Sequence, residues 1–286
     1  MKEKITILGH ENPDIDSILS GYILASYLRY KKYNAEYVIP DKDIDEDIKP
    51  ILEYCSITYS NFSSSVASYD KLILVDHYKT KFSNDVIAVI DHHPTISEFN
   101  YPNYINKPAS STTKHIYDII HKENPDYISR RLVELVLIGM AVDTCSFRSS
   151  KALPGDKEWF LNMCEKYNLN KEKIIEFGDC ITDTSNIDKT IVNGFKEYNY
   201  NNKIVGSSYT QTYGLNDNIR TLIIDNLKEK VIKDKYYMWV FMDVNLKNNT
   251  SVVYEIYNNK IDVKEYDFIV SRALNIMPDI ELRLSK

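Results

Sequence analysis

The fold of this chain is decided by one stretch near its start, Ile5-Thr6-Ile7-Leu8-Gly9-His10-Glu11-Asn12-Pro13-Asp14-Ile15-Asp16. Its first four residues are a short apolar run, which is typical of a buried strand. Polar residues end that run, and residues 17–32 then carry apolar side chains at helical spacing. The sequence therefore predicts a strand, a polar turn and a helix, in that order.

Short apolar runs and amphipathic stretches continue to alternate through the first half of the chain. Strands are predicted at Glu36–Ile39, Leu72–Val75 and Val86–Ile90, and helices at Ser111–His121 and Ser129–Met140. This alternation predicts an α/β fold, in which a parallel sheet has helices on both faces. In such sheets, ligands bind beyond the carboxyl ends of the strands.

The second half has a different pattern, which predicts a smaller α+β domain. An antiparallel set of strands is expected at Lys203–Gln211, Tyr236–Leu246 and Ser251–Tyr257. A helix is expected between the first two strands, from Asn218 to about Asp234. We place the two domains at residues 1–184 and 190–286, with a linker at 185–189.

The composition is that of an ordinary globular protein. Hydrophobic residues make up 43% of the chain, and 41 acidic against 35 basic residues give a formal net charge of −6. A chain of this sign has no global attraction for a nucleic-acid backbone, so extended nucleic acid is not an expected partner. Its apolar runs are too short for a signal peptide or a membrane span. The four scattered cysteines indicate reduced thiols and a cytoplasmic protein.

Asp and His residues follow three of the predicted strands. They lie in the turn from His10 to Asp16, in Asp76-His77 and in Asp91-His92-His93. We expect them to meet, because the carboxyl ends of parallel strands share one edge. Imidazole together with carboxylate suits Mn, Co, Fe or Zn, and crowded aspartates repel one another unless cations neutralise them. Two divalent ions sharing a carboxylate would do so, and would convert a bridging water to hydroxide near neutral pH.

Four segments resemble the signatures of the DHH phosphoesterase superfamily, in order and with similar spacing. They are Gly9–Ile18, Leu74–His77, Ile90–His93 and Val142–Thr144. The resemblance is strongest to members with a DHHA2 C-terminal domain, namely the family II, manganese-dependent inorganic pyrophosphatases and the related exopolyphosphatases. Weaker likenesses lie at Pro108–Thr113, Phe147-Arg148-Ser149, Lys196-Glu197-Tyr198 and Ser271-Arg272.

The resemblance implies a role for each matching residue of the N-terminal domain. The implied metal ligands are His10 and Asp14 for one ion, Asp16, His92 and Asp143 for the other, and Asp76 as a bridge between them. His93 is expected to contact substrate phosphate and to help protonate the leaving group. His77 and Asp91 are expected to orient the ligands. The implied cofactors are two Mn²⁺ ions, with Co²⁺ or Mg²⁺ as alternatives.

In the C-terminal domain the resemblance implies a clamp for substrate phosphate. Lys196 and Arg272 resemble the cations that bind the phosphate carrying the leaving group, and Arg148 is a further candidate. The active site would then lie in the cleft between the domains. The hydroxyls and amides of residues 110–113 either cap the following helix or hold a phosphate.

Two positions depart from the family pattern. Ala273 follows Ser271-Arg272, where family II pyrophosphatases usually carry a lysine that binds substrate, and Tyr78-Lys79 stands in place of Asn-Glu. Lys79 either replaces the missing cation or favours a longer polyphosphate or a phosphate ester. Both departures concern the choice of substrate and leave the implied metal ligands intact.

The predicted function is metal-dependent hydrolysis of phosphoanhydride bonds, with inorganic pyrophosphate as the first candidate substrate and short polyphosphate as the second. A nucleotide or oligonucleotide phosphoesterase is an alternative, but the Gly-Gly-Gly-His-type loop of those enzymes is missing, since all eight glycines are isolated. A non-catalytic module that binds phosphate ligands is another, although it would be expected to have lost a metal ligand. The family often forms homodimers, which the strand edge at Glu36–Ile39 would permit.

Overall fold

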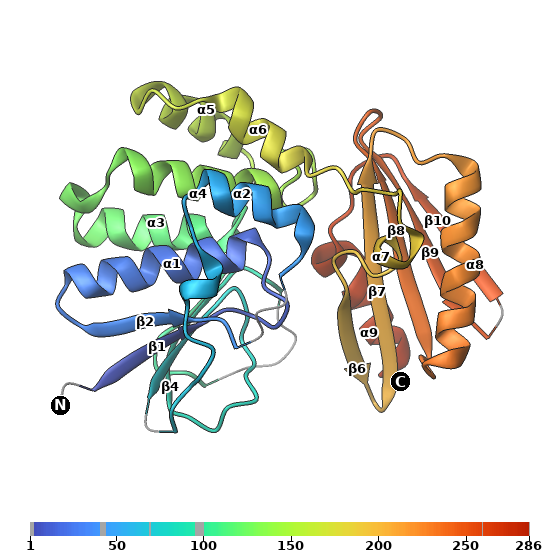
Figure 1. The fold of residues 1–286 in the computed structure, drawn as a ribbon, viewed down its shortest axis with the longest axis horizontal. Coiled ribbons are helices and arrows are strands. Elements are labelled where there is room, and N and C mark those ends of the chain that lie inside the picture. The colour runs from blue at the N-terminus through green and yellow to red at the C-terminus, as the bar shows by residue number, and fades with distance from the viewer. Residues whose placement is uncertain (1–2, 41–43, 69, 95–99, 259, 286) are drawn as a thin grey trace. The chain divides into compact units, whose positions relative to one another are not determined.

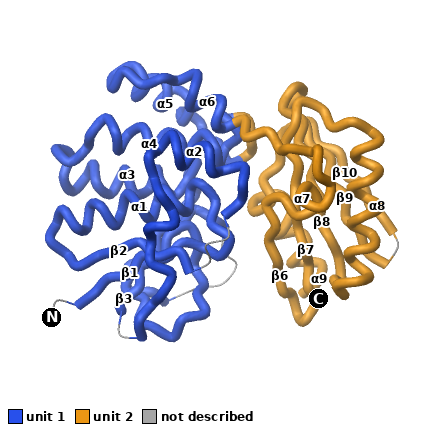
Figure 2. The backbone as a smooth tube through the Cα atoms, in the orientation of Figure 1, with its two compact units in different colours: residues 1–147, 151–178 blue, residues 148–150, 179–286 orange. Residues whose placement is uncertain are grey.

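The computed structural model describes residues 3–40, 44–68, 70–94, 100–258 and 260–285. The chain divides into two compact units (Figure 2). Unit 1 comprises Met1–Phe147 and Lys151–Gly178, and unit 2 comprises Arg148–Ser150 and Asp179–Lys286. Residues 185–189, expected to be a linker, lie inside unit 2, and a domain boundary there stays a prediction.

Unit 1 is built on a five-stranded sheet in the order β2-β1-β3-β4-β5. Figure 1 shows β1 and β2 beneath α1, which packs on them. The strands are β1 (Lys4–Leu8), β2 (Asn34–Val38), β3 (Lys71–Val75), β4 (Val86–Asp91) and β5 (Tyr104–Asn106). Every pairing is parallel, which confirms the α/β fold and parallel sheet predicted from the alternation of strands and helices. Strand β5, with three residues, is too short for a sequence pattern to predict.

The helices of unit 1 cover the sheet through one large apolar core. They are α1 (Ile15–Tyr30), α2 (Lys49–Tyr54), α3 (Thr112–Glu123), α4 (Arg130–Asp143), α5 (Asp156–Lys166) and α6 (Lys171–Asp179). Successive strand residues face opposite sides, so Ile73 and Val75 join this core while Leu72 and Leu74 join a second cluster. Side chains from connecting segments, such as Phe82, pack against that second cluster.

The turn after β1 is held tightly against the start of α1. Asp14 caps the helix, its carboxylate accepting a hydrogen bond from the backbone N–H of Ser17 at 3.1 Å. This cap starts α1 at Ile15, two residues before the predicted start. A Cβ on Gly9 would lie 2.2 Å from Ser17 Oγ, so only glycine allows the strand to end this close to the helix.

Unit 2 is a second five-stranded sheet, in the order β10-β9-β8-β7-β6, with a helix packed on each face. Its elements are α7 (Ile187–Thr190), β6 (Lys196–Tyr200), β7 (Lys203–Thr212), α8 (Asp217–Lys233), β8 (Met238–Asn245), β9 (Thr250–Tyr257), β10 (Lys260–Tyr266) and α9 (Met277–Leu284). Helix α8 packs over Trp239 and Phe241, and α9 packs over Val240 and Met242. Among the described residues, no helix is long and apolar enough to cross a membrane.

The prediction of an antiparallel set is wrong for β7 and β8, which pair in parallel from Val205–Met238 to Thr212–Asn245. Helix α8 connects the two strands and brings the chain back to the end of the sheet at which β7 begins. A crossover of this kind joins parallel strands. The next pair, β8 and β9, is antiparallel across the turn Lys247–Thr250, as predicted.

Candidate metal centre

Asp and His side chains meet where β1, β3 and β4 end, beside the C-terminal end of α4. Three overlapping groups have ligand atoms within 4.8 Å of one another: His10, Asp14 and Asp76; Asp16, His92 and Asp143; and Asp76, His92 and His93. The structure thus brings together all the residues expected to be metal ligands. Asp76 belongs to two of these groups, which is the arrangement that a bridging carboxylate requires.

The two carboxylate oxygens of Asp76 face different imidazoles. His10 Nε2 lies 3.4 Å from Asp76 Oδ2 and 3.3 Å from Asp14 Oδ2. His92 Nε2 lies 3.5 Å from Asp76 Oδ1 and 3.3 Å from Asp143 Oδ2. Asp76 therefore has one oxygen directed to each of two neighbouring groups.

Backbone carbonyls fix the tautomers of both imidazoles. Nδ1 of His10 lies 2.7 Å from the carbonyl oxygen of Glu11, and Nδ1 of His92 lies 2.9 Å from that of Ala109. A carbonyl oxygen can only accept, so each Nδ1 carries the proton and each Nε2 presents its lone pair to the carboxylates. This is the state in which histidine binds a metal ion.

Several acceptor atoms at the centre are buried without a hydrogen bond. Among the described residues, Asp76 Oδ2, His92 Nε2 and Asp143 Oδ2 have no hydrogen-bond partner. Buried polar atoms nearly always have one, and acceptors that face each other need a donor or a cation between them. Mixed imidazole and carboxylate ligands suit Mn²⁺ and its transition-metal neighbours. The residues present therefore fit divalent metal ions.

Asp16 is held by the first turn of α3. Its carboxylate accepts hydrogen bonds from the backbone N–H groups of Thr112 at 2.7 Å and Thr113 at 3.0 Å. Ser111 caps the same helix, accepting from Lys114 N at 3.2 Å. The amides of Thr112 and Thr113 are thus occupied by Asp16. Of the two functions considered for residues 110–113, capping the helix and holding a phosphate, the structure shows the helix cap.

The buried carboxylates are electrostatically strained. Burial raises the pKa of Asp16 well above its usual range, and the nearby charges of Asp76 and Asp143 raise it further. Burial and the charge of Asp14 act in the same direction on Asp76, but the neighbouring imidazoles of His10 and His93 bring the pKa of Asp76 below its usual range. Opposite shifts in neighbouring carboxylates are expected where an acidic cluster lacks its counter-ions.

Asp91 contacts His93 and belongs to none of the three groups of candidate ligands. Its Oδ1 lies 2.8 Å from His93 Nδ1 and also accepts from the backbone N–H groups of His92 and His93, while Oδ2 accepts from Asn106. Burial would raise the pKa of Asp91, but the hydrogen bond and charge of His93 hold it below its usual range. His77 contacts the carbonyl of Val75 at 3.0 Å, and burial lowers its pKa to about 4. The orienting roles of His77 and Asp91 stay predictions.

Lys151 belongs to the centre and was not singled out by the sequence analysis. Its ammonium forms an ion pair with Asp143 Oδ1, and their side chains are 15% and 13% exposed. Burial would lower the pKa of Lys151, but the charges of Asp143, Asp76 and Asp14 raise it above its usual range. Residues 145–147 all have positive φ and bend the chain sharply after Asp143. No motif around Lys151 could have predicted this ion pair.

The expected phosphate-binding cations lie in unit 2. Lys196 is half-buried at the start of β6. Arg272 donates from Nη1 to the carbonyl oxygen of Gly194 at 2.7 Å and to Ser207 Oγ at 3.0 Å. Arg148 forms an ion pair with Asp179. Their roles in substrate binding stay predictions.

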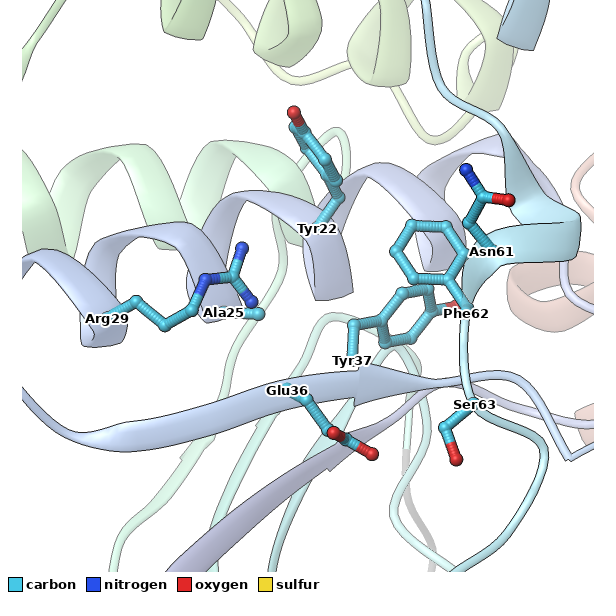
Figure 3. Close-up of a pocket in the computed structure, with 8 residues that line it drawn as sticks. All are labelled: Tyr22, Ala25, Arg29, Glu36, Tyr37, Asn61, Phe62 and Ser63. Atoms are coloured by element: carbon cyan, nitrogen blue, oxygen red, sulfur yellow. The ribbon is translucent and has the colours of Figure 1, made fainter.

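A cavity of about 200 Å³ lies elsewhere in unit 1, between α1, β2 and residues 61–63 (Figure 3). Tyr37 and Phe62 contact each other there edge to face, with ring centroids 5.2 Å apart. None of the predicted site residues lines this cavity. It is a gap beside a buried aromatic pair and is separate from the metal centre.

Relatives of known sequence align with nearly all or about half of this chain. A manganese-dependent inorganic pyrophosphatase of Methanocaldococcus jannaschii is 26% identical, with 96% of this chain and 97% of the relative aligned. A protein of Bacillus cereus described as a probable manganese-dependent inorganic pyrophosphatase is 33% identical, over 51% of this chain and half of the relative.

Solved structures share the fold, and a family model matches unit 1. The crystal structure of a candidate family II inorganic pyrophosphatase from Methanococcus jannaschii superposes with a TM-score of 0.81 at 22% identity, covering 99% of this chain and all of that one. An exopolyphosphatase-related protein from Bacteroides fragilis superposes with a TM-score of 0.54 at 15% identity, covering 99% and 93%. Residues 4–140 match the model of the DHH family, N-terminal domain. This part of the chain is therefore similar to the N-terminal domain of the DHH family.

Proposed function

We propose that this protein hydrolyses phosphoanhydride bonds, with inorganic pyrophosphate as its substrate and two divalent ions, Mn²⁺ above all, as cofactors. The observation that carries the proposal is the position of Asp76, whose two oxygens face separate His and Asp groups. The full-length similarity to a manganese-dependent inorganic pyrophosphatase supports the choice of bond and of metal. Small phosphate compounds are thus the class of substrate.

The proposed ligands are His10 and Asp14 for one ion, Asp16, His92 and Asp143 for the other, and Asp76 for both. When bound, such ions neutralise phosphate charge and lower the pKa of a water molecule so that it can attack phosphorus. The protein's own contribution is orientation. Thr112 holds Asp76 through a hydroxyl hydrogen bond of 3.1 Å, and the amides of α3 hold Asp16.

We further propose that His93 contacts substrate and donates a proton to the leaving phosphate. Its Nδ1 is engaged by Asp91 at 2.8 Å, and the carboxylate in turn is held by two backbone amides. Such a pair stabilises the protonated imidazole and leaves Nε2 to reach the substrate. The His93 side chain is 20% exposed, which supports access by a small anion.

The remaining candidates differ in substrate and not in metal chemistry. Short polyphosphate contains the same anhydride bond, so an exopolyphosphatase is the second candidate. Nucleotide substrates and a non-catalytic binding role are the other two. All the candidate metal ligands are present, which argues against the non-catalytic role, because a module that only binds phosphate does not require a complete set of metal ligands.

We also propose a cytoplasmic homodimer. No disulfide joins the four cysteines, which all lie in the described part of the chain and suit a reducing compartment. Strand β2 is an edge strand of the parallel sheet, and edge strands offer backbone groups to a second copy. On the side away from β1, its last residue, Val38, forms a bridge to Ser63.

The bridging role of Asp76 predicts a linked loss of metal and turnover. Asp76→Asn keeps the shape of the side chain but removes the charge between the two groups, so bound Mn²⁺ should fall from two ions per chain to at most one. Metal analysis after dialysis gives the count, and phosphate release should fall to background. Asp225→Asn, on an exposed α8 residue paired with Lys228, is the matched control. A fully active Asp76→Asn enzyme would refute the two-ion assignment.

The proposed reaction predicts a defined order of substrates. The Mn²⁺-loaded protein should release phosphate fastest from pyrophosphate, more slowly from tripolyphosphate and long polyphosphate, and not from short oligoribonucleotides. A colorimetric phosphate assay measures the first three, and chromatography of the oligoribonucleotides measures the last. Activity on oligoribonucleotides alone would overturn the proposal, and no release from any of them would favour the binding module.

The proposed clamp predicts a defect in substrate binding for Arg272→Ala. Loss of a charge-assisted hydrogen bond should raise KM for pyrophosphate about 10- to 100-fold while both metal ions stay bound. Urea unfolding shows whether the lost contacts to Gly194 and Ser207 also weaken the fold. Lys233→Ala, an exposed change in the same unit, should leave KM unaltered. Unchanged kinetics in a folded Arg272→Ala protein would refute the clamp.

The proposed dimer predicts a particle of twice the chain mass of 33.3 kDa. Light scattering at micromolar concentration measures this directly. Glu36→Arg, on the edge strand β2, should shift the protein toward the single-chain mass because it places a second positive charge beside Lys4, which pairs with Glu36 at 2.9 Å, so that the two copies would repel each other at this edge. A single-chain mass for the unaltered protein would rule the dimer out.

A further inference from the structure

Lys151 contacts one oxygen of the Asp143 carboxylate, and the other oxygen faces the metal centre. The ammonium binds Oδ1 of Asp143, whereas Oδ2 lies 3.3 Å from His92 Nε2 and faces the Asp16, His92 and Asp143 group. A metal ion on Oδ2 and an ammonium on Oδ1 can therefore occupy the same carboxylate together. Both side chains are largely buried, so this cation is fixed beside the centre and is not a mobile surface lysine.

The charge count indicates what this cation does when the ions are present. The candidate ligands include four carboxylates, Asp14, Asp16, Asp76 and Asp143, so two divalent ions balance them: −4 + 4 = 0. Lys151 then adds one positive charge in a site with little exposure to water. When the ions are bound, the negative charge of Asp143, the partner of Lys151, is largely neutralised by the metal. A buried ammonium in that position requires another anion.

Lys151 is better placed for this than the other cations considered. Lys79, the candidate replacement for the missing clamp lysine, is exposed and lies 5.5 Å from the ring centroid of Tyr78. Arg148 is paired with Asp179 in unit 2. Lys151 instead contacts a carboxylate of the metal centre directly. Lys151 and Asp143 both belong to unit 1.

We propose that Lys151 binds a phosphate oxygen of the substrate beside the ion held by Asp16, His92 and Asp143. Lys151 would then supply the positive charge that family II pyrophosphatases usually have at the position of Ala273. The proposal rests on the proposed function and names a specificity-determining residue for it. An ammonium has three donors and can bind a carboxylate and a phosphate together. Lys151 thereby favours substrates with a high charge density, such as an inorganic diphosphate.

Binding without turnover tests the proposal. Calorimetry on the Mn²⁺-loaded protein would measure the affinity for imidodiphosphate, a diphosphate analogue with nitrogen at the bridging position, and for inorganic phosphate. Lys151→Met should weaken imidodiphosphate binding about 10- to 100-fold, the usual effect of losing a charge-assisted hydrogen bond. Lys151→Arg should stay within about threefold of the unaltered protein, because it keeps the charge. Lys171→Met, an exposed change on α6, is the control.

A second measurement separates substrate binding from a merely structural role. Manganese titration should show that Lys151→Met binds two ions at least as tightly as the unaltered protein, since a neighbouring positive charge has been removed. Loss of an ion instead would mean that Lys151 only holds Asp143 in place, which would overturn the proposal. Lys151→Gln, which keeps a donor without the charge, gives the same comparison should Lys151→Met fold poorly.

Lys79→Met, measured in parallel, decides between the two lysines. Weakened imidodiphosphate binding in Lys79→Met, with no change in Lys151→Met, would overturn the proposal. It would also be overturned if the unaltered, Mn²⁺-loaded protein bound neither imidodiphosphate nor phosphate. Failure of the proposed function has a different result: the analogue binds and depends on Lys151, but pyrophosphate is not hydrolysed.

Discussion

Repulsion among buried carboxylates is the constraint on which unit 1 depends. Asp16, Asp76 and Asp91 are at most 2% exposed, and all three lie at the same edge of one sheet. Such a cluster is costly to bury unless each charge has a partner. The fold supplies partners of three kinds: the amides of α3 for Asp16, the imidazole of His93 for Asp91, and a lysine for Asp143. The acceptor atoms still without partners are those that face the centre.

This constraint explains local features that would otherwise be unfavourable. Asp76 has a φ of +64°, a backbone conformation that non-glycine residues rarely adopt and that costs about 1–3 kcal/mol. The conformation is held by a backbone hydrogen bond from Asp76 N to Ile90 O and by the hydroxyl of Thr112. The left-handed turn over residues 145–147 similarly directs Lys151 back to Asp143. In both places the unusual backbone conformation lies beside residues of the metal centre.

Much of unit 1 could be predicted because its strands and candidate ligands are marked by short, continuous stretches of sequence. Apolar runs marked the buried strands, and the Asp and His residues followed them directly, so parallel topology alone was enough to bring His10, Asp76 and His92 together. Asp143 could not be placed in this way, because it ends a helix and not a strand. Its inclusion came from resemblance. Lys151 could not be placed at all, since the bend before it is formed by Cys145, Ser146 and Phe147, none of which is typical of positive φ.

In unit 2 the sequence pattern predicted the elements better than their pairing. The strand and helix periods were visible, but a helix between two strands means a crossover, and that rule excludes the antiparallel pairing of β7 with β8. Strands β6 and β10 escaped prediction because they are edge strands with mostly polar or half-exposed residues. A partly exposed strand has no continuous apolar run, so its pattern resembles that of a loop.

Reaction class and substrate choice depend on different physical features of this chain. The reaction class depends on anionic and imidazole ligands, which the sheet edge gathers by topology and which a substitution in a distant loop would not disperse. Substrate choice depends on the number and position of the positively charged side chains that are available to the substrate after the metal ions have balanced the carboxylates. Such cations can be supplied from any segment that reaches the centre, as the pairing of Lys151 with Asp143 illustrates. A chain can therefore lose a lysine at one position of a family pattern and keep the same net charge at the substrate.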